Sequence, residues 1–163
     1  MDQGTQRFSA EIVVNADPVT AHKLFVSRVW WGGGFPWYLP LPASGVIEPQ
    51  QDESGKGSIR QVPGFIQEQI LDAQLGEYLE YTLKRKLFMP ISYHRGRVSF
   101  SQVEEGKTLV KWDVSYTPLP VVGALFPLFT STFSLFFLPA LQQACEEHKK
   151  KKDEEEEDKQ KIN

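Results

Sequence analysis

The chain has 163 residues, the length of one ordinary domain, and its 40% hydrophobic and 24% charged residues are typical of a folded globular protein. A formal net charge of -3 excludes the broad positive field with which proteins collect nucleic acid, so no nucleic-acid partner is expected. Cys145, the single cysteine, cannot form an internal disulfide, and residues 1–7 lack the apolar core of a secretory signal. We therefore expect a cytoplasmic protein.

The N-terminal part of the sequence predicts a strand followed by a short helix. Residues 7–15 alternate apolar and polar side chains, as a strand with one buried face does. Asp17 and Pro18 predict the start of a helix, because the carboxylate can accept from N–H groups of the first turn and proline has no N–H to leave unpaired. Three glycines at 32–34 predict that this helix ends near Trp31.

The middle of the chain predicts an antiparallel sheet. Residues 35–42 contain three prolines among aromatic residues and are expected to form an irregular loop. The alternating pattern then returns, interrupted by short turn sequences that leave no room for crossover helices, so the strands are expected to form a meander. The expected strands are 45–50, 57–62, 65–72, 77–83, 92–102 and 107–116.

An apolar run and a charged tail end the sequence. Residues 119–141 carry no charge and are numerous enough to cross a bilayer, but prolines and a Ser/Thr cluster oppose a spanning helix. Phe126, Phe129 and Phe133 follow a helical spacing, which favours one buried face of a terminal helix. Insertion of 119–141 into a membrane is the alternative. Residues 146–163, with four lysines before six acidic residues, are expected to be a frayed helix or disordered, which leaves 1–145 as the folded domain.

Several segments together carry a resemblance to a known superfamily. They are FSAEIVVNADPVTAHKLF (8–25), GKGSIRQV (55–62), QEQI (67–70), GEYLEYTL (76–83), YHRGRVSF (93–100) and TLVKWDVSYTP (108–118). In this order the chain resembles the START-like (SRPBCC) superfamily, specifically its polyketide cyclase/dehydrase and lipid-transport branch, over residues 7–145. The resemblance implies an α+β helix-grip fold, in which a curved antiparallel sheet of about seven strands wraps around a long C-terminal helix, with a short helix region after the first strand.

The resemblance also implies a function. Proteins of this kind bind a hydrophobic small molecule, such as a lipid, sterol, pigment precursor or polyketide, between the sheet and the last helix. A cyclase or dehydratase that works without a cofactor is the alternative. The aromatic segment 30–38 departs from the single tryptophan common in the superfamily, and we expect it to form an entrance able to touch a membrane surface transiently. We expect a monomer.

Large apolar side chains share faces of the predicted strands, where they form either packed core or the lining of a ligand pocket. Val110, Trp112, Val114 and Tyr116 alternate on the last strand in this way. The residues predicted to bind the ligand are Trp37, Tyr38, Arg60, Glu68, Tyr81, Val98, Phe100, Trp112, Phe129 and Phe133.

The charged candidates depend on strand register. Arg60 and Glu68 flank the Pro63-Gly64 turn and would meet if the turn places them on one face, either as a polar anchor for a ligand or as an ordinary surface or structural ion pair. A strict two-residue hairpin would instead place Arg60 opposite Gln67 and leave Glu68 on the other face.

His94 faces inward if Val98 does, and it joins Arg60 and Glu68 as a weak catalytic candidate, unless a bulge at Gly96 switches the phase of the strand. The three histidines and one cysteine form no recognisable zinc cluster, and no P-loop, dinucleotide fingerprint or nucleophile elbow occurs. We therefore expect neither a metal nor a cofactor.

Overall fold

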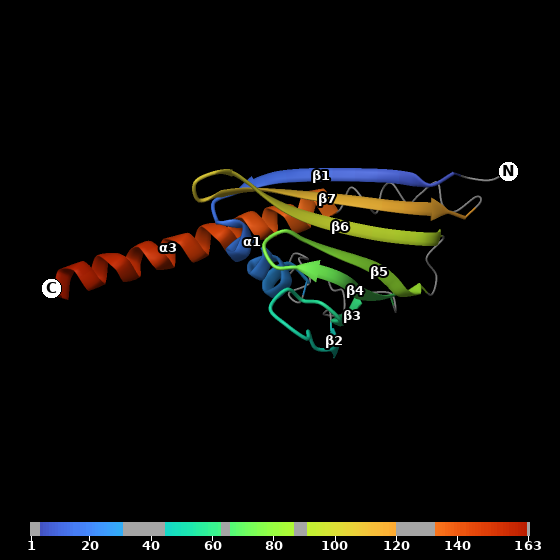
Figure 1. Ribbon diagram of the computed structural model, residues 1–163, viewed down its shortest axis with the longest axis horizontal. Coiled ribbons are helices and arrows are strands. Elements are labelled where there is room, and N and C mark those ends of the chain that lie inside the picture. The colour runs from blue at the N-terminus through green and yellow to red at the C-terminus, as the bar shows by residue number, and fades with distance from the viewer. Residues whose placement is uncertain (1–3, 31–44, 63–65, 87–90, 120–132, 163) are drawn as a thin grey trace.

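A seven-stranded antiparallel sheet and a long C-terminal helix dominate the fold (Figure 1). A computed structural model describes residues 4–30, 45–62, 66–86, 91–119 and 133–162. The strand order β1-β7-β6-β5-β4-β3-β2 joins neighbours along the chain, except that the first strand pairs with the last. The strands are β1 (Gln6–Val14), β2 (Gly45–Glu48), β3 (Ile59–Val62), β4 (Ile66–Gln74), β5 (Tyr78–Lys86), β6 (Ile91–Glu104) and β7 (Lys107–Pro118). This confirms the predicted antiparallel meander and helix-grip arrangement.

The alternating sequence patterns become the two faces of this sheet. Along β7, Val110, Trp112 and Val114 are buried on the inner face, which the helices cover, whereas Lys111 is exposed. The strands also differ from the prediction at one end of β3, which begins at Ile59 rather than at Gly57. The physical reason is that Gly57 has a φ of +78°, a left-handed conformation that belongs to a turn and not to a strand.

The first helix begins where the sequence predicts. In α1 (Pro18–Leu24), the Asp17 carboxylate accepts hydrogen bonds from the Thr20 backbone N–H at 3.0 Å and from the Thr20 hydroxyl at 2.6 Å. Burial opposes ionisation of Asp17, but these hydrogen bonds prevail and lower its pKa. The chain continues directly into the π-helix η1 (Phe25–Trp30), so the described helical segment ends at Trp30.

The C-terminal helical segment consists of η3 (Phe133–Phe137) and α3 (Leu138–Ile162). Its inward side buries Phe137, Leu141 and Cys145 against the rest of the core. The side chains of residues 146–160 are exposed, and the charged segment continues as helix to Ile162, extending away from the sheet in Figure 1. Phe126 and Phe129 lie outside the described residues. No helix in the described part of the chain combines the length and apolar character needed to cross a membrane.

Candidate functional site

The register of β3 and β4 brings Arg60 and Glu68 directly opposite each other. Val62 pairs with Ile66 rather than with Phe65, so the strict two-residue hairpin is not the arrangement formed. Arg60 is 1% exposed and Glu68 is 4% exposed. The two residues therefore form a buried ion pair on the inner face and not a surface pair, which leaves a polar anchor for a ligand and a structural ion pair as the two interpretations.

The Arg60 guanidinium joins the sheet to the end of the first helical segment. Its Nε and Nη2 atoms both lie 2.6 Å from Oε2 of Glu68. Its Nη1 atom donates to the backbone carbonyls of Val29, at 3.2 Å, and Trp30, at 2.5 Å. The Arg60 Cζ atom also lies 4.0 Å from the centre of the Trp30 ring, a cation–π contact. Arg60 thus uses most of its donors within the protein.

Glu68 is left with acceptor capacity. Both hydrogen bonds from Arg60 fall on Oε2, and no group in the described ranges donates to Oε1. The Glu68 side chain is 6% exposed, so this oxygen lies at the margin of the buried pair. The free capacity of the pair is therefore an acceptor, suited to a ligand hydroxyl or amine rather than to a second carboxylate.

Aromatic and polar side chains continue the site along the inner face. Trp112 donates from Nε1 to the Tyr81 hydroxyl oxygen at 2.8 Å. The Tyr81 ring stands edge-on to Trp30, with centroids 5.3 Å apart, and lies 5.5 Å from the His94 ring. Burial, together with the negative charge of Glu68, raises the pKa of Tyr81 well above its usual range. Tyr81 is therefore a neutral phenol at physiological pH.

Gly96 makes room for Tyr81. A Cβ atom at this position would lie 2.2 Å from the Tyr81 ring, far inside van der Waals contact. The register of β6 runs through Gly96 without a bulge, so strict alternation places His94 inward and Arg95 and Arg97 on the exposed face. Those two arginines pair with Glu80 there.

The remaining predicted ligand-binding residues divide into two groups. Val98, at 0% exposed, and Phe100, at 4%, are buried on the same inner face as Tyr81 and Trp112. Trp37, Tyr38 and Phe129 lie outside the described residues, and for Phe133 only the backbone, in η3, is described.

Two buried residues of this region were not identified from the sequence. Trp30 was expected in the aromatic entrance, but it is 0% exposed and packs inside. His22, also 0% exposed, accepts from the Gly76 N–H through Nδ1 at 3.2 Å, donates from Nε2 to the Ser54 carbonyl at 2.8 Å and stacks on Phe100. These bonds hold α1 against two turns and require the neutral ring. No sequence signal separates these residues from their neighbours, because all the contacts are long-range.

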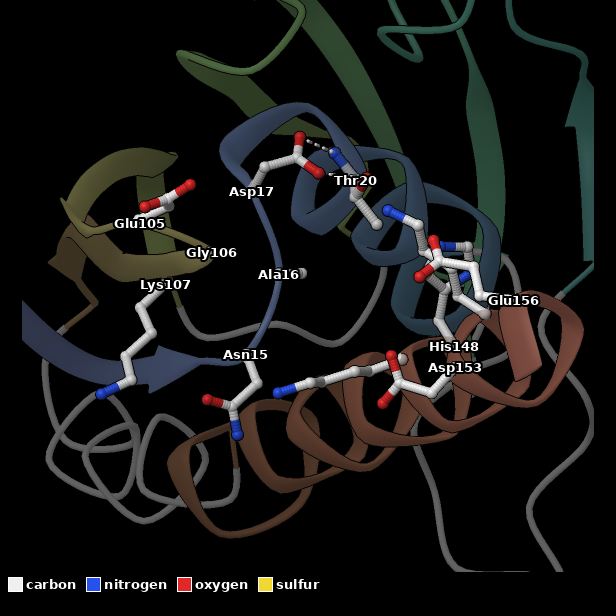
Figure 2. A pocket seen from close by; sticks show the side chains of 12 residues that line it. Asn15, Ala16, Asp17, Thr20, Glu105, Gly106, Lys107, His148, Asp153 and Glu156 are labelled. Atoms are coloured by element: carbon white, nitrogen blue, oxygen red, sulfur yellow. Dashed lines mark hydrogen bonds between the residues drawn. The ribbon is translucent and has the colours of Figure 1, made fainter. Parts of the chain in front are cut away.

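A concave feature lies on the outside of the domain (Figure 2). It is a cleft of about 420 Å³ at the point where α3 leaves the body. One wall comes from residues 15–17 and the β6–β7 turn at 105–107, and the other from α3, including His148, Asp153 and Glu156. Charged side chains of both signs dominate this lining, which does not suit a hydrophobic ligand. Among the described residues no group of three His, Cys, Asp or Glu side chains could hold a metal ion.

Comparisons with known proteins show the fold. Neither a family model nor a curated protein matches the sequence. Norcoclaurine synthase from Thalictrum flavum, in complex with dopamine and hydroxybenzaldehyde, is 18% identical, with 90% of each chain covered and a TM-score of 0.64. XoxI from Bacillus cereus is 22% identical, with 85% of this chain and 94% of that chain covered and a TM-score of 0.61.

The di-domain ARO/CYC protein BexL of the BE-7585A biosynthetic pathway is 15% identical. The alignment covers 87% of this chain and 50% of that one, with a TM-score of 0.66. The present chain therefore has the helix-grip fold of the START-like proteins, as the sequence resemblance predicted.

Proposed function

We propose that this protein binds a hydrophobic small molecule between the inner face of its sheet and its C-terminal helix. The observation that carries the proposal is the buried polar cluster of Arg60, Glu68, Tyr81 and Trp112, surrounded by apolar side chains on that face. A core that served packing alone would be as stable, or more so, with apolar residues in place of a buried ion pair. Polar groups inside apolar walls are instead typical of ligand pockets, in which they orient the bound molecule.

Desolvation supplies most of the affinity in this proposal. Burying about 300 Å² of apolar ligand surface contributes roughly 7 kcal/mol before the costs of association, which is compatible with micromolar binding. The polar cluster then selects the ligand. Because no described residue donates to one oxygen of Glu68, a ligand hydroxyl can bind there, whereas a ligand carboxylate would be repelled.

A cofactor-free cyclase or dehydratase is the second candidate. It is favoured by Tyr81, a phenol that burial and the Glu68 charge keep protonated and thus able to donate a proton or a hydrogen bond. The similarity in fold to norcoclaurine synthase and to the ARO/CYC protein BexL is compatible with such chemistry on this scaffold. Turnover of a retained ligand, abolished by Tyr81→Phe, would distinguish the enzyme from a binding protein.

Native mass spectrometry of protein purified without detergent tests the proposal directly. We expect a stoichiometric hydrophobic adduct, which solvent extraction then identifies. Glu68→Gln keeps the shape of the side chain but removes its charge, and should weaken binding of the extracted molecule about tenfold. Glu11→Gln, on an exposed position of β1, is the matched control. A protein that retains no ligand and binds no hydrophobic probe would contradict the proposal.

A further inference from the structure

The indole N–H of Trp30 is a buried donor for which the described part of the chain offers no acceptor. Trp30 is 0% exposed, and its Nε1 atom has no hydrogen-bond partner among the described residues. The ring itself is held firmly, since Arg60 stacks on its face and Tyr81 stands edge-on to it. Rotation of the indole toward solvent would break both contacts, so the unpaired donor belongs to the packed arrangement.

Trp112 provides an internal comparison. It is as deeply buried as Trp30, at 1% exposed, and lies on the same inner face. Its Nε1 atom, however, donates to the Tyr81 hydroxyl at 2.8 Å. Buried polar groups in native proteins are nearly always paired, so one left unpaired requires an explanation. Both indoles pack against Tyr81, but only that of Trp112 has a hydrogen-bond partner among the described residues.

We propose that the Trp30 N–H donates to an oxygen acceptor of the bound molecule. The inference rests on the proposed function and names the ligand class: a neutral hydrophobic molecule with a carbonyl, ether or hydroxyl oxygen at the end that meets the Arg60–Glu68 pair. Arg60 connects Trp30 with Glu68, because it stacks on the Trp30 ring and binds the Glu68 carboxylate. A pure hydrocarbon would leave the Trp30 N–H unsatisfied.

Two probes that differ in a single non-hydrogen atom test this inference. 2-Acetylnaphthalene presents a carbonyl oxygen, and 2-isopropenylnaphthalene has the same shape with a CH₂ group in its place. We expect the ketone to bind about three- to tenfold more tightly, the effect of one neutral hydrogen bond. In ¹⁵N-labelled full-length protein, the Trp30 indole N–H signal should move downfield with the ketone and not with the hydrocarbon.

Two variants assign the signals and control for structure. Trp30→Phe removes the N–H and should abolish the preference for the ketone, while Trp112→Phe identifies the signal of the indole that is already paired. The preference is a ratio of two affinities in one variant, so a general loss of packing does not imitate the effect.

The outcomes separate this inference from the proposed function. Equal binding of both probes, with the Trp30 signal unmoved, would overturn the inference and leave the proposed function intact. The same result is expected if a retained water molecule satisfies the N–H. A ketone preference that survives in Trp30→Phe would also overturn the inference. Binding of neither probe would count against the proposed function, and the inference would fall with it.

Discussion

Replacing Gly96 with alanine should disrupt the centre of the site by displacing Tyr81. The new Cβ atom would lie 2.2 Å from Cε1 and Cζ of Tyr81 and 2.6 Å from its hydroxyl oxygen, whereas an ordinary contact needs at least 3.4 Å. The ring cannot simply move aside, because Trp30 and His94 pack around it and Trp112 donates to its hydroxyl.

The cost of Gly96→Ala follows from three contributions. Overpacking costs about 1–3 kcal/mol, and loss of the Trp112 hydrogen bond adds about 0.5–1.5 kcal/mol. Alanine lowers the conformational entropy of the unfolded chain relative to glycine, which offsets about 0.4–1 kcal/mol of this destabilisation. Combined at their midpoints, these contributions lower the free energy of unfolding by about 2 kcal/mol.

Urea unfolding followed by tryptophan fluorescence measures this change. Gly4→Ala, where no atom lies within 4 Å of the added Cβ, is the control and should stay close to wild type. In a Tyr81→Leu background the clash is largely removed, so Gly96→Ala should cost less than about 1 kcal/mol. An unchanged free energy of unfolding for Gly96→Ala in the wild-type background would refute the packing of Tyr81 over Gly96.

Three further predictions concern buried ionisable groups. Arg60→Met alone should lower the free energy of unfolding by about 3–5 kcal/mol, because it leaves Glu68 buried and unpaired. The double variant Arg60→Met/Glu68→Leu should lower it by less in the same urea assay, and an equal or larger loss would contradict this reasoning. Burial lowers the pKa of His22, despite the opposing effects of its bond to the Ser54 carbonyl and of the nearby Asp52 charge. The unfolded state therefore binds the proton first, and stability should fall as the pH drops below about 6.5 and respond less to pH in His22→Gln. Burial raises the pKa of Cys145 to about 12, so Ellman's reagent at pH 8 should label the thiol only after unfolding; rapid labelling of the folded protein would contradict this.

The local patterns of the sequence determined the elements and their faces. Val110, Trp112 and Val114 are buried on β7 because side chains alternate along any strand, whatever its partners. Asp17 begins α1 because its carboxylate reaches an N–H only three residues away. Such interactions depend on neighbouring residues alone, and for that reason the sequence by itself predicts the fold class.

Tertiary structure alone decided how the candidate site is assembled. The pairing of Arg60 with Glu68 depends on strand register, and the sequence allowed two registers across the turn. Trp30 packs inside the domain against the guanidinium of Arg60 on β3. Position 96 requires glycine because the Tyr81 ring on β5 lies against it. These contacts join different strands, or a strand and the first helical segment, so the spacing within one element does not encode them. They form only when the elements pair and pack.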